Sequence, residues 1–440
     1  MKISKRNLQK YLFLLIALGG IFVAVKSIWF EKPYFSYRFR IAPSVAKANT
    51  ETILREKIAK NPNAAFEMTD LANHLLSEAK RRDNANLYDE ASELAKRSLE
   101  ILPQPNLGSK IVLANTLQAK HAFTAADTLA NEVLTEQQAH PGALQIRATI
   151  ALARGDLSLA ARLLSKKLSS QPDTQGFAFR GWVYSLQGRG PEAELDFKRA
   201  VRSEDFGQRE VSAEARNFMA RHYMSRGQYS TAHKALEISL VLNPENPFTH
   251  YLKGECLWEE REYRKAGEKY LKAFELTPHP KYLVAYGRSL YRQGKIESAK
   301  QYLSRAIGLL RKDLKENPTG HGLDLVEGLL WMSTPDSVIE SLGIITQEQK
   351  ERPQSLELLF WKIIALEQKG RRKQAKALLN QALATGVRSA KYYALAARLS
   401  GNDSPAGRVF QQLLNEKNPK FSTESLPDPM AGLASSKPQT

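Results

Sequence analysis

The feature that most constrains this 440-residue chain is a pattern that recurs 34 residues further along it. Ala220, Tyr223, Gly227, Tyr229, Ala232 and Pro244 are followed, in the same order, by Gly254, Leu257, Arg261, Tyr263, Ala266 and Pro278. A period of this length, with helical spacing of apolar residues, indicates repeats made of two antiparallel helices. Because such repeats are stable through stacking on their neighbours, we predict one all-α solenoid rather than two or three globular domains.

The same register extends in both directions from this pair of copies. Positions twelve residues apart mark where two helices pack: Ala114/Ala126, Ala148/Ala160, Gly181/Ala193, Gly287/Ala299 and Ile363/Ala375. The offset grows to 39 between Ala193 and Ala232, so residues 205–211 are expected to lengthen one turn between helices. Residues 312–353 keep a helical apolar period without the small pair, and they are interpreted as a degenerate helical repeat.

These residues resemble the tetratricopeptide repeat, in which small side chains let the two helices approach and a proline closes the second helix. The resemblance implies a right-handed superhelix and a non-enzymatic scaffold that binds another protein. It also implies that the first helix of each repeat lines a concave groove. In this register the groove positions are Trp182, Asn217, Arg221, Tyr251, Glu255, Trp258, Arg288, Tyr291 and Arg292. The alternative for the aromatic members is that they pack neighbouring helices, as aromatics at helical spacing usually do.

The N-terminus has the residue order of an export signal or signal anchor. A basic segment, residues 1–10, precedes a mostly apolar run, residues 11–30. Twenty helical residues reach about 30 Å, the thickness of a hydrocarbon core. Aromatic residues at both ends, Tyr11 and Trp29, favour a retained single-pass transmembrane anchor over a cleaved signal. Basic residues on the two sides balance, so a cytoplasmic array stays open, although the export-signal order favours a periplasmic or extracytoplasmic one.

The rest of the chain divides by composition. Residues 31–50 contain two prolines and no helical period, which indicates a linker. The main repeat array is assigned to residues 51–311, and tetratricopeptide-like repeats resume over residues 354–419 after the degenerate segment. Residues 420–440 hold few apolar side chains and are expected to be a disordered tail.

No catalytic or metal-binding constellation is evident in the sequence. The single cysteine, Cys256, excludes an intramolecular disulfide and any multi-cysteine metal site. The eight histidines show no metal-ligand spacing, and the glycines near Lys295 do not form a phosphate-binding loop. We therefore predict no enzyme activity, no cofactor and no metal.

The charge leaves a second functional class open. A net charge of +18 and a pI near 9.7 indicate acidic partners such as anionic glycan or lipid headgroups; nucleic acid is not expected. An anchored solenoid also resembles bacterial membrane-tethered assembly factors for envelope polysaccharide. In that alternative the chain binds a glycan or other polyanion, with Arg221, Arg288 and Arg292 supplying charge and Trp182, Trp258 and Tyr291 supplying stacking surfaces.

Overall fold

The computed structural model describes residues 34–39, 50–82, 84–316, 321–421 and 423–427, and every regular element within them is helical. Within these residues, helix α2 (Thr50–Lys60) precedes a series of helical hairpins and a 3-10 turn, η1 (Thr423–Ser425). The hairpins are α3 (Ala65–Arg82) with α4 (Ala85–Ile101), α5 (Leu107–Ala119) with α6 (Phe123–Glu136), α7 (Pro141–Arg154) with α8 (Leu157–Ser170), α9 (Thr174–Leu186) with α10 (Gly190–Arg202), α11 (Arg209–Ser225) with α12 (Tyr229–Leu242), α13 (Pro247–Glu259) with α14 (Tyr263–Leu276), α15 (Pro280–Arg292) with α16 (Ile296–Glu316), α17 (Gly322–Met332) with α18 (Pro335–Glu348), α19 (Leu356–Gln368) with α20 (Arg372–Ala384), and α21 (Ala390–Ser400) with α22 (Pro405–Lys417). The prediction of an all-α solenoid is confirmed.

The small residues of the repeat pattern lie where the two helices of a hairpin touch. A Cβ atom added to Gly254 would lie 2.5 Å from the Tyr270 ring, and one on Gly287 would lie 2.7 Å from Leu303. Both glycines therefore allow the second helix to approach more closely than a larger residue would permit. At the turn between helices, Gly227 has φ +69°, and Arg261 adopts nearly the same left-handed conformation at φ +62°.

The two irregular stretches of the sequence have structural counterparts. The lengthened turn is the loop between α10 and α11, residues 203–208, and α11 itself runs for 17 residues. The segment interpreted as a degenerate repeat contains the hairpin α17–α18, which packs against its neighbours like the other hairpins. Residues 317–320, between α16 and α17, lie outside the described residues.

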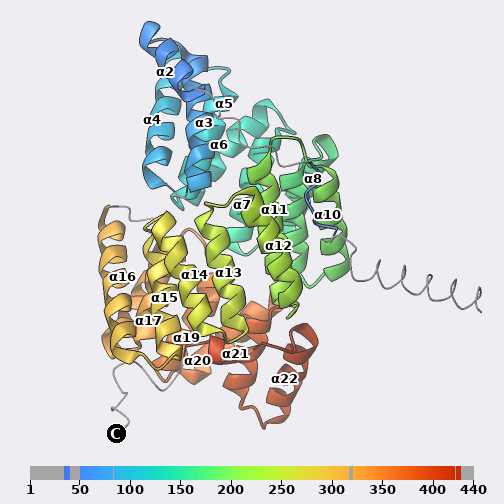
Figure 1. Ribbon diagram of the computed structural model, residues 1–440, viewed down its shortest axis with the longest axis vertical. Coiled ribbons are helices and arrows are strands. Elements are labelled where there is room, and N and C mark those ends of the chain that lie inside the picture. The colour runs from blue at the N-terminus through green and yellow to red at the C-terminus, as the bar shows by residue number, and fades with distance from the viewer. Residues whose placement is uncertain (1–33, 40–49, 83, 317–320, 422, 428–440) are drawn as a thin grey trace, which may run out of the picture.

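The array curls so that its C-terminal hairpins lie beside its middle ones (Figure 1). Three turns that follow C-terminal second helices contact turns of the earlier hairpins. The Arg388 backbone N–H donates to the Leu186 carbonyl at 3.3 Å, and Asn418 Nδ2 donates to the Met224 carbonyl at 3.1 Å. Gly155, at φ +90°, lies so close to the Gln354 backbone that a Cβ atom there would overlap its carbonyl oxygen. The solenoid is therefore closed on itself rather than extended.

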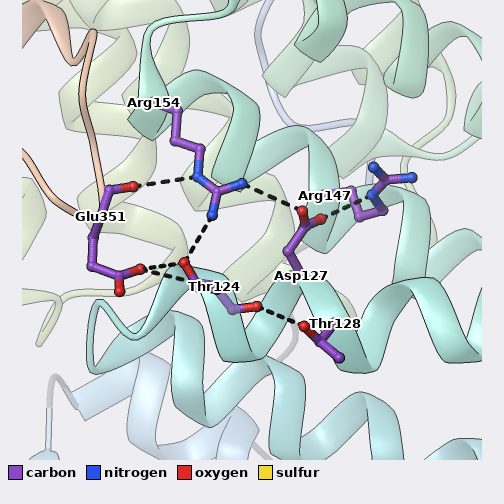
Figure 2. Close-up of polar contacts among 6 residues, drawn as sticks. All are labelled: Thr124, Asp127, Thr128, Arg147, Arg154 and Glu351. Carbon is purple, nitrogen blue, oxygen red and sulfur yellow. Dashed lines mark hydrogen bonds and ion pairs between the residues drawn. The ribbon is translucent and has the colours of Figure 1, made fainter.

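A polar cluster at Glu351 shows how one of these closing contacts is made (Figure 2). The Glu351 carboxylate accepts hydrogen bonds from the Thr124 backbone N–H at 3.0 Å and from its hydroxyl at 2.8 Å. Arg154 Nε donates to the Glu351 carbonyl at 3.3 Å, and Arg154 is held in turn by Asp127 at 3.3 Å. Since Thr124 and Glu351 are 227 residues apart, this cluster joins the first hairpins to the later half of the chain.

Residues 34–39, within the expected linker, are docked on α10 and α11. Phe35 is 2% exposed, and its carbonyl accepts a hydrogen bond from Arg216 Nε at 2.8 Å. Arg216 also forms an ion pair with Glu204, and both side chains are fully buried. The Tyr34 hydroxyl donates to Glu194 at 2.8 Å and lies 2.6 Å from the Tyr223 hydroxyl. We call residues 34–39 the latch segment.

The predicted anchor, residues 11–30, lies outside the described residues. Among the residues that are described, no helix has both the length and the apolar character needed to cross a bilayer.

The start of the expected disordered tail is packed, which corrects that expectation. Leu426 is 2% exposed within the C-terminal core, and Arg398 Nη1 donates to the Pro427 carbonyl at 3.0 Å. The buried Leu426 side chain and the backbone carbonyls that accept hydrogen bonds from arginines hold these residues against the array. Residues 428–440 lie outside the described residues.

Candidate functional site

Six of the predicted groove residues come together on α13 and α15 around Arg288. This guanidinium is 6% exposed; it pairs with Glu255 and donates to Glu327 at 2.9 Å, and it lies 4.7 Å from the Trp258 ring centre. Burial raises the pKa of Glu327 to about 7, against the lowering effect of Arg288. Arg288 and Trp258, which is 1% exposed, are therefore committed to internal contacts.

Tyr251 and Tyr291 complete this cluster as half-buried rings. Tyr251 packs between Tyr270 and Tyr282, each with ring centres 5.8 Å from its own. Tyr291 packs edge-on against Trp331 at 6.0 Å. For these aromatic residues, as for Trp258, the structure favours the packing interpretation over an exposed binding surface.

Asn217 belongs to a separate buried network. Its Nδ2 donates to the Thr249 hydroxyl at 3.0 Å, and its Oδ1 accepts from the Ser239 hydroxyl at 3.0 Å. Asn217 is 4% exposed, so these bonds satisfy its amide inside the hairpin junction. Asn217 thereby links α11, α12 and α13, and little of its side chain is accessible to a partner.

Arg221 is the groove cation whose charge is not paired. Its guanidinium stacks on Trp182 at 4.2 Å from the ring centre, and Trp182 is 8% exposed. Burial lowers the pKa of Arg221, and the largest opposing influence is the charge of Glu357 on α19. Among the described residues, Arg221 makes no hydrogen bond or ion pair. A desolvated cation held on an aromatic face is suited to an incoming carboxylate.

Arg292 lies at the end of α15 and binds the C-terminal segment of the chain. Its Nη2 donates to the Leu426 carbonyl at 3.0 Å, and its guanidinium lies 5.5 Å from the Trp331 ring centre. Nearby, the Ser425 hydroxyl donates to Glu259 at 3.3 Å, and burial raises the pKa of Glu259 to about 7. Arg292, one of the predicted groove residues, is therefore already bound to a segment of the same chain.

Several residues of this region were missed by sequence reasoning. Glu327 and Trp331 lie on α17, where the repeat register was lost, so no inward positions could be assigned there. Glu357 on α19 influences the pKa of Arg221, and Lys391 on α21 influences that of Glu259, because the array is closed. Glu357 and Lys391 are charged residues, each on the first helix of a C-terminal repeat. Such a residue can be recognised as part of this region only when it is known that the array closes on itself.

The structure also brings together a histidine cluster that sequence spacing did not reveal. His279 Nε2 and His321 Nε2 are 3.1 Å apart, and His321 Nδ1 lies 3.3 Å from Asp324. His279 Nδ1 accepts the Lys281 backbone N–H at 3.2 Å, so a neutral His279 carries its proton on Nε2 and donates it to His321. This assigned chain of hydrogen bonds uses the atoms that a metal would need, because a metal-bound histidine normally donates from its other nitrogen.

A second group, His233, Cys256 and Glu260, has the residue types of a metal site. His233 Nε2 lies 2.6 Å from Glu260, and Cys256 is fully buried. Burial raises the pKa of the Cys256 thiol, which keeps it protonated, whereas a metal binds the thiolate. Neither cluster therefore fits a metal ion well.

Comparison with known proteins identifies part of the repeat array. Residues 219–281, from the end of α11 to the start of α15, match the tetratricopeptide repeat family. This interval contains the two copies from which the period was read. A search of curated protein sequences found no significant match.

Many solved structures share helical repeats with the chain. A chain of the APC/C Cut9–Hcn1 hetero-tetramer is 14% identical over 72% of this chain, which spans 58% of that one, with a TM-score of 0.46. A thermophilic tetratricopeptide repeat protein of Thermus thermophilus is 22% identical over 42% of this chain and 99% of its own length, with a TM-score of 0.37. A tetratricopeptide repeat protein of Parabacteroides merdae is 15% identical over 58% of this chain and 98% of its own length, with a TM-score of 0.40.

These structural similarities are too distant to transfer a function. The family match and the observed helices agree, however, that the middle of the chain consists of helical hairpin repeats. The sequence match places tetratricopeptide repeats in residues 219–281, which include α12, α13 and α14, and helical hairpins continue on both sides of them.

Proposed function

We propose that the chain is a membrane-anchored, non-enzymatic scaffold that binds an extended segment of a partner protein across its repeats. The tetratricopeptide match supports the protein-binding part of this proposal. The anchor rests on the sequence of residues 11–30, and the order of basic and apolar segments favours an array outside the cytoplasm.

The proposal rests on the contacts that the chain's own residues 418–421 and 423–427 make with the repeats. These residues cross the C-terminal ends of three successive first helices, contacting Met224 of α11, Glu259 of α13 and Arg292 of α15. The Arg292 contact uses the backbone carbonyl of Leu426, a group that any extended peptide offers, whereas Asn418 and Ser425 contribute side chains. Main-chain hydrogen bonds of this kind supply affinity, while side-chain pockets supply specificity.

Arg221 supplies a specificity element for the partner segment. Its charge is desolvated and faces the interior of the closed array, with Glu357 as an electrostatic neighbour. A partner carboxylate reaching Arg221 would compensate a buried charge, so the partner segment is expected to be acidic at one position.

The alternative of glycan or polyanion binding requires exposed cations beside exposed aromatic rings. Arg288 is instead paired with two carboxylates, and Trp258 is almost fully buried beneath it. Arg292 is engaged with a peptide carbonyl. Protein binding is therefore the better supported proposal.

The binding site is tested by charge reversal on the two faces of one repeat. Arg221→Glu on the inner face of α11 is expected to abolish cross-linking of partners in cells, because it places like charges opposite each other. Lys234→Glu, on the exposed face of α12, is the matched control and should leave capture intact. Equal capture by both variants, with unchanged circular dichroism, would remove Arg221 from the site.

The anchor and its orientation are tested separately. Membrane fractionation with alkaline carbonate extraction should leave the full chain in the membrane pellet. A C-terminal tag should then be digested in spheroplasts without lysis if the array lies outside the cytoplasm. Digestion only after lysis would reverse the proposed orientation, and complete extraction by carbonate would contradict the anchor.

A further inference from the structure

The lengthened turn between α10 and α11 is the dock of the latch segment. The Arg38 backbone N–H donates to Glu204 at 3.4 Å, and the Arg38 side chain donates to the Arg202 carbonyl. Phe39 lies edge-on against Phe206 with ring centres 5.8 Å apart. The extra residues of this turn therefore contribute two of the contacts that hold the latch segment.

The latch segment follows closely on the apolar run of the sequence. Only residues 31–33 separate Phe30 from Tyr34, and four residue steps of extended chain reach at most about 14 Å. If residues 11–30 anchor the chain, the surface that holds Tyr34 must lie within that distance of the bilayer. This step rests on the anchor of the proposed function.

The surface around the latch segment combines exposed apolar and basic side chains. Phe206 is 73% exposed and Leu195 is 47% exposed, and neither side chain belongs to a hydrophobic core. Lys198 and Arg202 are exposed on the same helix, and neither forms an ion pair among the described residues. Asp205 on the adjoining turn and Glu210 and Glu214 on the adjoining helix are acidic, and Glu204 of the same turn is buried in its pair with Arg216. Aromatic and basic side chains together are typical of surfaces that contact phospholipid headgroups.

We propose that a latch face, made of Arg38, Phe39, Leu195, Lys198, Arg202 and Phe206, lies against the headgroups of an anionic phospholipid bilayer. The buried pair of Arg216 and Glu204 binds the latch segment, through the Phe35 carbonyl, to the helices that carry this face. The repeats are thereby fixed in one orientation on the membrane, with α10 toward the lipid. The face that carries the partner-binding groove keeps a constant position relative to the bilayer.

The test uses the purified full chain reconstituted in vesicles and a fluorophore attached at one engineered cysteine. The native Cys256 is fully buried and stays unlabelled in the folded chain. Phe206→Cys carries the probe on the latch face, and Val409→Cys, at a 57% exposed position of α22, is the matched control. Quenching by spin-labelled lipid reports which position lies at the bilayer, and carbonate extraction reports the anchor independently.

The expected result is loss of fluorescence at position 206, none at position 409, and retention in the pellet. Retention without loss at position 206 would overturn the latch face and leave the anchor standing. Extraction with loss at position 206 on anionic vesicles would support the latch face and overturn the anchor. Extraction without loss would overturn both.

Vesicle composition and charge reversal test the chemistry of the contact. Loss of fluorescence at position 206 should be greater with vesicles rich in phosphatidylglycerol than with phosphatidylcholine alone. Lys198→Glu with Arg202→Glu should reduce the loss, whereas Lys373→Glu with Lys376→Glu, an equal reversal on α20, should not. Equal quenching in both vesicle types and both double variants would overturn the assignment to anionic lipid.

Discussion

Two extended segments dock on the helical array, and the arginines that bind them differ in burial. The latch segment is held by Phe35, which is 2% exposed and whose carbonyl accepts from Arg216, a fully buried side chain paired with Glu204. The C-terminal segment, residues 423–427, is held by Leu426, also 2% exposed, and by carbonyls that accept from the half-buried Arg292 and Arg398. The latch segment is therefore part of the fold, while the C-terminal segment resembles a bound peptide.

The two segments also depend on different parts of the molecule. The latch segment contacts α10, α11 and the loop between them, which are consecutive in the chain. The C-terminal segment reaches α13 and α15 only because the array is closed on itself. A change that opens the closure should release the second segment and spare the first.

The largest loss of stability is expected from a substitution that removes a contact of the latch segment. Arg216→Ala leaves the Glu204 carboxylate buried without its partner, which costs about 3–5 kcal/mol of stability. The midpoint of urea denaturation should fall accordingly, while Arg202→Ala, at an exposed position of α10, should leave it unchanged. Equal midpoints for the two variants would show that the latch segment is not built into the fold.

A smaller loss of stability is expected at the closing contact of Gly155. Gly155→Ala places a Cβ in a left-handed backbone and against the Gln354 carbonyl, at a cost of about 2 kcal/mol or more. Hydrogen exchange should accelerate over residues 418–427 and stay slow at Phe35. Acceleration at both segments would contradict the independence of the latch segment.

The closure is also expected to weaken on acidification. Burial, aided by Arg352, His321 and Lys281 and opposed by Asp324, lowers the pKa of His121 to about 4. Below about pH 6.5 the unfolded chain binds a proton that the closed form excludes, so stability falls by about 3 kcal/mol by pH 4.

Protonation of His321 changes the stability in the opposite direction from protonation of His121, so the two effects must be distinguished. Although burial opposes its charge, the hydrogen bond to Asp324 raises the pKa of His321, so its contribution is present at low pH and lost as pH rises. His121→Asn keeps a residue that tolerates φ +61° and removes the His121 proton alone. The pH dependence of the denaturation midpoint should be shallower in this variant; an unchanged slope would exclude His121 as the cause.

The smallest effect is expected at the C-terminal segment. Arg292→Ala removes one hydrogen bond to a carbonyl, worth about 1 kcal/mol, and should speed tryptic cleavage after Lys420 without changing the denaturation midpoint. Arg305→Ala, on the neighbouring α16, serves as the control. Unchanged cleavage in Arg292→Ala would mean that this contact does not retain the segment.

The repeats were predictable and the closure was not, for a physical reason. Small residues such as Gly254 recur with the period of the hairpin, because each hairpin needs the same close approach. The contact of Thr124 with Glu351 spans 227 residues and has no period to reveal it. Arg288 was expected in an open groove, but one of its carboxylate partners, Glu327, lies in the stretch where the register fails.

The most direct measurement is binding of a fluorescent peptide comprising residues 418–430 to the full chain, followed by anisotropy. The attached segment competes at a high effective concentration, so the native chain should bind the peptide weakly. Leu426→Asp should undock the attached segment and increase the affinity, and adding Arg292→Ala to that variant should reduce it again. Failure of the undocked chain to bind the peptide would contradict the account of these repeats as a site for an extended partner segment.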